Sequence, residues 1–248
     1  MREQRDLESR IQLLSVPLDI VTDIETSIDR LLARQESSQI VFLGLWDFVR
    51  ARSSSLFAIA VRNAALVVPT SRIVVQIAWL LRKVRIPRYI PFDFVIRVLS
   101  VIEKRGRTLY MIGSRPRELQ LAASNVRGSF PELQIVGVCA GYFETGDEED
   151  IILAIRKAAP TLVLAGYGVP GRERWPHIHR EKFSTSMSVW CGPCVDMFSG
   201  KRTRTSRRVW ESGLDFVPSF LTHPWRIYRL FVYVWLLFVV LLNRVRRA

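Results

Sequence analysis

The stretch "RTLYMIGSRPRELQLAASNVRGSFPELQIVGV", residues 107–138, decides the fold. An apolar run of strand length over 107–113 is followed by a helical pattern over 117–127 and a second apolar run over 134–138. A strand, a helix of about ten to fifteen residues and another strand form a βαβ unit, in which the two strands run parallel. Neither strand shows the polar alternation of a half-exposed strand, so we expect a sheet that is covered on both faces.

The same alternation continues on both sides of this unit. Further strand-like runs lie at 39–45, 65–68, 161–166 and 187–190. Helical patterns lie at 22–35, 53–63, 72–84, 93–104, 145–158 and 172–181, and Thr-x-x-Glu capping boxes open the first and the fifth of them. Residues 1–20 carry no clear pattern, and only helices are expected after Cys194. This order predicts an α/β fold with a Rossmann-like, mostly parallel sheet and helices on both faces, followed by an all-helical basic C-terminal appendage.

Composition divides the chain into an α/β domain over 1–200, a basic helical appendage over 201–223 and a hydrophobic helix over 224–248. From Lys201 onward, ten basic residues stand against two acidic ones, so +8 of the formal net charge of +13 lies in the last 48 residues. The charge-free run "LFVYVWLLFVVLLN" lies inside this basic segment, at 230–243. Nucleic acid would explain the charge but not the apolar run, whereas an anionic membrane surface explains both.

We therefore expect residues 201–248 to bind an anionic membrane, with no nucleic acid as a partner. The helix over 224–248 is predicted to enter the bilayer from one side or to span it once. No signal-peptide pattern is found at the start of the chain, so the globular domain is placed on the cytoplasmic face of the cell membrane. The alternative is that the C-terminal helix is buried in an oligomer.

The motif Trp190-Cys191-Gly192-Pro193-Cys194 is identical to the redox motif of thioredoxins. Thioredoxin-like folds need further strands after this motif, and the remaining residues contain no good strand. We therefore favour a tight turn between a strand and a helix, in which glycine and proline serve the geometry. In a reducing cytoplasm both thiols are expected to stay free.

Glycine recurs where each predicted strand ends. The four loops are "GSRP" (113–116), "CAGYFE" (139–144), "GYGVPGRERW" (166–175) and "CGPCVDMFSGK" (191–201). Ligands of open α/β sheets bind at the carboxyl ends of the strands, and glycine lets the backbone approach a phosphate-bearing ligand closely. Any one of these loops alone is better explained as an ordinary turn, but the series together predicts a binding edge.

Taken together, the loops resemble the WecG/TagA/CpsF family of bacterial glycosyltransferases. The residues that carry the resemblance are Arg88, Asp93, Gly113, Gly141, Tyr142, Phe143, Pro160, Gly166, Gly168, Pro170, Glu173, Trp175, Gly192, Asp196, Gly200, Arg204 and the run 213–216. The family transfers N-acetylmannosaminyl or related sugars onto undecaprenyl-diphosphate-linked acceptors of surface polymers. The resemblance implies a UDP-sugar donor. Its implied substrate-binding residues are Arg88, Asp93, Gly113, Gly141, Tyr142, Gly168, Pro170, Arg172, Glu173, Gly192, Asp196 and Arg204. No metal site is predicted, because His177 and His179 lack a convincing constellation of metal ligands.

The chain departs from the family where the resemblance implies the general base. The family has an aspartate at the position of Thr70, an asparagine at Gly44 and a glutamine at Arg172. A threonine cannot accept the proton of an acceptor hydroxyl at neutral pH without a base of its own. Asp47 and Asp93 are therefore the candidate substitute bases.

Three interpretations follow from these departures. The chain is an active, diverged glycosyltransferase that uses Asp47, Asp93 or another acid, or it is a degenerate member that binds substrate or supports an active paralogue or a second copy. A non-enzymatic membrane-associated scaffold is the third. The partners expected are a nucleotide sugar, the lipid-linked acceptor and the membrane surface.

Overall fold

The computed structural model describes residues 10–34, 36–183, 185–204, 210–211 and 228–245. Its centre is a six-stranded sheet of order β4-β3-β8-β7-β5-β6, in which every neighbouring pair is parallel. The strands are β3 (Ser38–Leu43), β4 (Leu66–Pro69), β5 (Thr108–Ile112), β6 (Gln134–Cys139), β7 (Leu162–Ala165) and β8 (Met187–Trp190). The predicted α/β fold with a parallel sheet is confirmed.

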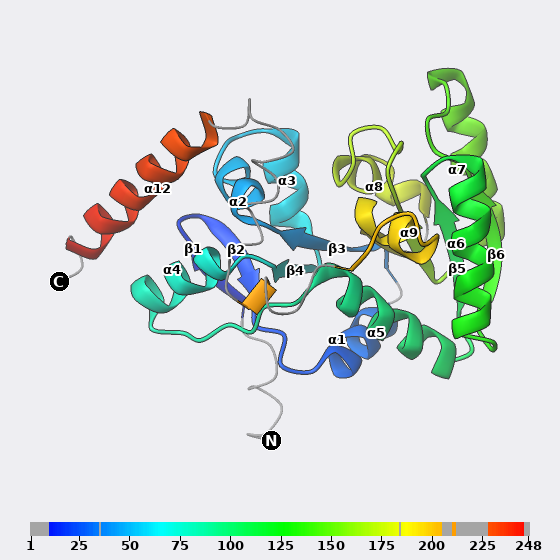
Figure 1. The fold of residues 1–248 in the computed structure, drawn as a ribbon, viewed down its shortest axis with the longest axis horizontal. Helices are drawn as coiled ribbons and strands as arrows, with labels where there is room; N and C mark the ends of the chain where they lie inside the picture. Colours follow the sequence, from blue (N-terminus) through cyan, green and yellow to red (C-terminus); the bar gives the residue numbers. More distant parts are fainter. Residues whose placement is uncertain (1–9, 35, 184, 205–209, 212–227, 246–248) are drawn as a thin grey trace.

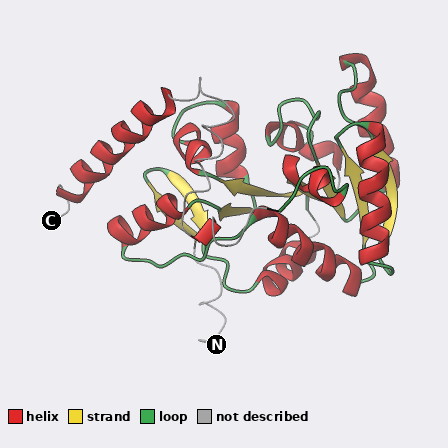
Figure 2. Cartoon of the chain, viewed as in Figure 1, coloured by secondary structure: helices red, strands yellow, loops and turns green. Residues whose placement is uncertain are grey.

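Helices cover both faces of the sheet, as Figures 1 and 2 show. One face is covered by α1 (Ile24–Ala33), α5 (Pro91–Lys104), α6 (Pro116–Ser129) and α9 (Gly192–Phe198). The other face is covered by α2 (Leu45–Ala51), α3 (Leu56–Asn63), α7 (Glu148–Ala158) and α8 (Arg174–Ile178), with 3-10 turns at Thr145–Asp147 and Arg180–Phe183. Successive residues of β5 alternate between these two layers, because side chains on a strand point to opposite faces.

Two local predictions were wrong, and one pair of strands was missed. The run 39–45 was expected to be a strand throughout, but Gly44 ends β3 and α2 begins at Leu45. The helix expected over 172–181 is divided into α8 and the 3-10 turn that follows. The unpatterned N-terminal segment forms an antiparallel hairpin of β1 (Arg10–Leu13) and β2 (Val16–Asp19). Its turn is hidden in the sequence because Leu14 and Ser15, rather than glycine or asparagine, adopt positive φ of 48° and 70°.

Asp19 fastens this hairpin to the main sheet. Its carboxylate accepts hydrogen bonds from the Arg10 guanidinium, at 2.7 and 2.9 Å, and from the backbone N–H of Val67 on β4, at 2.6 Å. Arg10 also donates to the carbonyl oxygen of Ala64 at 2.8 Å. Asp19 is only 6% exposed, so removal of its carboxylate would leave the buried N–H of Val67 without an acceptor.

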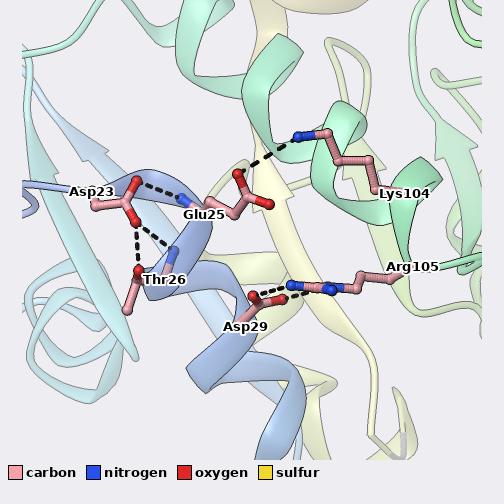
Figure 3. A network of polar contacts seen from close by, with 6 residues as sticks. All are labelled: Asp23, Glu25, Thr26, Asp29, Lys104 and Arg105. Carbon is pink, nitrogen blue, oxygen red and sulfur yellow. Dashed lines mark hydrogen bonds and ion pairs between the residues drawn. The ribbon is translucent and has the colours of Figure 1, made fainter.

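The ion pairs between α1 and the end of α5, unlike the ion pair of the buried Asp19, are exposed to solvent (Figure 3). Asp23 caps α1 by accepting from the backbone N–H groups of Glu25 and Thr26. Glu25 pairs with Lys104 at 3.6 Å, and Asp29 pairs with Arg105 through two hydrogen bonds of 3.0 and 2.5 Å. Because these ion pairs are open to solvent, each contributes little to stability.

We expect Asp19→Ala to lower the free energy of unfolding by about 2 kcal/mol, because it leaves the buried N–H of Val67 unpaired and removes the ion pair with Arg10. Asp29→Ala is the matched control and should change it by less than about 1 kcal/mol. Urea denaturation of both variants measures the difference. Equal effects would show that the hairpin is not held by Asp19.

The described C-terminal helix, α12 (Tyr228–Val245), lies at the end of the molecule opposite β6 (Figure 1). Its Leu236 and Val240 are buried against the cluster that contains α2, α4 (Arg72–Arg82) and the hairpin. Among the residues that the structure describes, no helix combines the length and the apolarity needed to cross a bilayer. The prediction that 224–248 spans the membrane once is therefore unsupported. The predicted basic helix over 201–223 lies largely outside the described residues.

Candidate active site

A cavity of about 180 Å³ lies where β3, β4 and β8 end. It is lined by Phe42, Gly44, Asp47, Thr70, Pro91, Glu173, Trp190, Cys191 and Pro193. The parallel sheet brings these segments together, because the carboxyl ends of parallel strands share one edge. The backbone N–H of Thr70 donates to the carbonyl oxygen of Leu43 at 3.0 Å and holds the ends of β4 and β3 side by side.

Asp47 lies in the first turn of α2 and faces this cavity. A Cβ atom built on Gly44 would lie 3.3 Å from Asp47 Oδ2 and 3.8 Å from Thr70 Oγ1, so the carboxylate and the hydroxyl occupy the same side of Gly44. Arg50, one turn later, pairs with Asp47 at 3.3 Å. Burial raises the pKa of Asp47, and the positive charges of Arg50 and Arg172 oppose that rise.

Glu173 is the second carboxyl group of the cavity. It lies in the loop after β7, and its backbone carbonyl oxygen accepts a hydrogen bond of 2.7 Å from the side-chain amide of Gln39 on β3. The residue is 6% exposed, and its Oε2 has no hydrogen-bond partner among the residues that the structure describes. Burial, reinforced by the negative charge of Asp47, raises the pKa of Glu173 to about 7.

Arg172 supplies positive charge beside both carboxyl groups. It has a positive φ of 55°, and its guanidinium lies 5.6 Å from the centre of the Trp190 ring. The indole N–H of Trp190 donates to the carbonyl oxygen of Gly166 at 3.0 Å, which fixes that ring. The exposed Pro170 belongs to the same loop.

A larger pocket of about 480 Å³ lies next to this cavity, since Pro91 lines the cavity and its neighbours Ile90 and Phe92 line the pocket. The polar and charged residues of this pocket are Arg88, Tyr89, Asp93, Arg97, Arg204 and Trp210. The guanidinium of Arg88 lies 3.8 Å from the centre of the Trp210 ring and donates to the Trp210 carbonyl oxygen.

Asp93 pairs with Arg204 at 3.4 Å in this pocket. Of the two candidate substitute bases, the structure places Asp47 beside Thr70 and Asp93 in the adjacent, arginine-rich pocket.

The glycines in the loops that follow β5, β6 and β7 let these loops pack against each other. Gly113 has φ of 119°, and a Cβ there would lie 2.7 Å from the backbone of Gly166. A Cβ on Gly141 would lie 2.6 Å from the carbonyl oxygen of Tyr167, and one on Gly168 would meet the ring of Tyr142 at 2.7 Å. The structure therefore accounts for these glycines by contact between loops, where the sequence predicted close approach of a ligand.

Three more predicted residues lie near these loops. Tyr142 is 66% exposed and has φ of 61°. Asp196 lies inside α9 and accepts a hydrogen bond of 3.0 Å from the hydroxyl of Ser114. Gly192 begins α9, and a Cβ there would lie 2.6 Å from the ring of Tyr167.

The two cysteines of the thioredoxin-like motif form a disulfide. The prediction that both thiols stay free is therefore wrong for this structure. The turn into α9 brings the two Cα atoms to 5.3 Å, a separation that a disulfide bridges without backbone movement. Cys191 lines the cavity, while Cys194 is fully buried in the core below it.

Sequence reasoning missed several residues of these pockets. Gln39 is the polar residue that opens an otherwise apolar strand run, and Arg50 follows Asp47 by the three residues that place two side chains on one helix face. Both patterns were visible. No local pattern singles out Arg97 or Trp210, which reach the second pocket from distant parts of the chain.

Comparison with known proteins gives one family. The family described as "Glycosyl transferase WecG/TagA/CpsF family" matches residues 11–248. An N-acetylglucosaminyldiphosphoundecaprenol N-acetyl-beta-D-mannosaminyltransferase of Bacillus subtilis is 24% identical over 135 residues, which cover 54% of this chain and 52% of that protein. A protein of the same name from Bacillus spizizenii is 24% identical over 166 residues, which cover 66% of this chain and 64% of that protein. The match thus spans about half to two thirds of these relatives. Since the family match covers nearly the whole chain, this protein belongs to the WecG/TagA/CpsF family of glycosyl transferases.

Proposed function

We propose that this protein transfers an N-acetylhexosamine-type sugar from a UDP-sugar to an undecaprenyl-diphosphate-linked acceptor. The reaction belongs to the synthesis of cell-envelope polysaccharide and takes place at the cytoplasmic face of the membrane. The family membership and the names of the two relatives support this class of reaction. The observation that carries it is the position of Asp47, a carboxylate beside the residue that replaces the family base.

In this proposal Asp47 is the general base. It takes the proton of the acceptor hydroxyl while the hydroxyl oxygen forms a bond to the anomeric carbon of the donor sugar. The bond from that carbon to the nucleotide diphosphate breaks, and the electron pair leaves with the diphosphate. A carboxylate whose pKa is raised by burial is a stronger base than an exposed one, which suits it to this step.

Arginine side chains are proposed to stabilise the departing diphosphate. Arg172 lies over the ring of Trp190, which lines the cavity, and Arg88, Arg97 and Arg204 lie in the adjoining pocket. Guanidinium groups bind phosphate oxygens through paired hydrogen bonds and keep their charge at any working pH. Tyr142 presents an exposed ring at the same sheet edge and is proposed to contact the donor.

Transfer by the purified full-length protein in detergent tests this function. UDP-N-acetylmannosamine and UDP-N-acetylglucosamine are offered with a lipid-diphosphate-linked N-acetylglucosamine, with and without EDTA. We expect turnover that EDTA does not abolish. No turnover by the native chain, together with turnover by Thr70→Asp, would support a degenerate member instead. That second candidate rests on the ion pair of Asp47 with Arg50, which leaves the carboxylate less free to act.

We further propose that α12 docks on the membrane surface without crossing it. Its Phe231, Val234, Trp235 and Phe238 are between 52 and 78% exposed. Basic groups adjoin this apolar face, since the guanidinium of Arg52 lies 5.1 Å from the centre of the Trp235 ring. An apolar helix face beside basic groups matches the interface of an anionic bilayer.

Replacement of Phe231, Trp235 and Phe238 by serine is expected to weaken binding to anionic vesicles at least tenfold, because three large apolar side chains no longer enter the bilayer. Vesicle co-sedimentation at fixed salt measures this. Leu121→Ser with Ile178→Ser is the control, since both residues are exposed on other helices. Unchanged vesicle binding combined with loss of a dimer would assign this face to a second copy of the chain.

A further inference from the structure

The backbone segment that carries Glu173 is anchored at two residues, Glu173 itself and Trp175. The Gln39 side chain bonds to the Glu173 carbonyl oxygen at 2.7 Å. Two residues later, Trp175 is 2% exposed, and its indole N–H donates to Glu148 at 2.5 Å. These contacts fix the backbone from which the Glu173 side chain extends.

The position of this carboxyl group needs an explanation, because burial of a polar atom without a partner is unfavourable. Glu173 Oε2 is buried and accepts no hydrogen bond within the described part of the chain. Arg50 and Arg172 act on Glu173 through their charge, and neither forms an ion pair with it. Cores that keep such a group commonly use it toward a ligand.

A ligand of Glu173 would lie in the cavity that this residue lines. Glu173 and Asp47 line the same space of about 180 Å³, together with Thr70 and Trp190. A carboxyl group in either protonation state pairs with a hydroxyl, which both donates and accepts. Sugars carry a hydroxyl group on most of their ring carbons, and the aromatic ring of Trp190 offers an apolar surface for a sugar ring.

We propose that Glu173 binds a hydroxyl group of a sugar substrate in this cavity and orients that sugar against Asp47. The inference rests on the proposed function, and it adds the group that recognises the sugar as distinct from the nucleotide or the lipid. The hydroxyl belongs either to the hexosamine of the donor or to the sugar of the acceptor. Glu173 is then a specificity-determining residue, and Asp47 keeps the proton transfer.

Calorimetric titration of the full-length protein in detergent tests this inference without requiring turnover. The ligands are UDP, UDP-N-acetylmannosamine and a short-chain lipid-diphosphate-linked N-acetylglucosamine. The variants are Glu173→Met, which has similar length and no polar oxygen, and Glu173→Gln, which keeps a hydrogen-bonding end. Glu181→Met, at an exposed position nearby, is the control for the loss of a carboxylate. Thermal melting checks that each variant is folded.

We expect Glu173→Met to weaken the binding of one sugar ligand at least tenfold, with Glu173→Gln within about threefold of the native protein. If the hydroxyl group belongs to the donor sugar, UDP-sugar binding weakens while UDP binding is unchanged. If it belongs to the acceptor sugar, only acceptor binding weakens. Folded Glu173→Met that binds both sugar ligands as tightly as the native protein would overturn the inference, as would equal weakening of UDP and UDP-sugar. If the native protein neither binds these ligands nor transfers sugar, the proposed function itself is overturned.

Discussion

Asp47→Asn is expected to lower the rate of sugar transfer by about 10²- to 10⁴-fold, the usual contribution of a positioned general base. Asparagine fills the same space, but its amide cannot accept the proton of the acceptor hydroxyl. The nucleotide sugar should still bind within a few-fold of the native affinity, because Arg88 and Arg204 lie in the neighbouring pocket. The measurement is kcat for transfer beside the Kd of the donor.

Asp93→Asn is the matched control for this prediction. Asp93 is a second acidic candidate, but it pairs with Arg204 in the adjoining pocket. Its substitution should therefore change donor binding more than kcat. Addition of Thr70→Asp to Asp47→Asn should restore part of the rate, since it places a carboxylate beside the substituted position in the same cavity. An Asp93→Asn loss as large as that of Asp47→Asn would contradict the assignment of the base.

Glu173→Gln is expected to raise the free energy of unfolding by about 3 kcal/mol at about pH 8. The pKa of Glu173 is raised from 4.5 to about 7. Between these two values the folded protein keeps a proton that the unfolded chain has lost, so stability falls as the pH rises through this window. Burial also raises the pKa of Asp47, which therefore acts in the same direction. Glutamine never ionises, so it avoids the cost of a buried charge above about pH 7.

Urea denaturation at about pH 4 and about pH 8 measures this difference. The native protein and Glu173→Gln should be similar at the lower pH, where the native carboxyl group is protonated in both states. The gain should emerge as the pH rises toward 8. Glu181→Gln, at an exposed position, should show no such pH-dependent gain. A gain that is equal at both pH values would mean that shape, and not charge, sets the effect.

Most of the fold could be predicted from the sequence, because its central strands are continuous apolar runs. Runs such as 161–166 and 187–190 can be stable only when both faces are covered, which demands a parallel sheet with helices on two sides. The hairpin of β1 and β2 was missed because its turn uses Leu14 and Ser15 at positive φ, and no sequence signal marks that geometry.

The site was predictable only in part. Asp47 was named as a substitute base, and the structure places it beside Thr70 because the ends of β3 and β4 are neighbours in the sheet. Glu173 and Asp47 share a cavity because segments more than 120 residues apart in the chain meet there, so no local sequence pattern predicts it. The glycines do lie at the carboxyl ends of the strands, but the structure explains them by the packing of loop against loop.

The sheet order has a consequence for how the chain is made. Strands β7 and β8 lie between β3 and β5, although both follow β6 in the sequence. On the ribosome, the β3–β4 and β5–β6 pairs therefore emerge as two separate halves, and the β3 edge of one and the β5 edge of the other stay unpaired until β8 and β7 arrive. At about 5–20 residues per second, roughly three to ten seconds pass between the completion of β6 and that of β8. During that interval the open edges are templates for pairing with other chains. The insertion of residues 162–190 closes the sheet, so nascent chains that stop short of β8 should be the aggregation-prone ones.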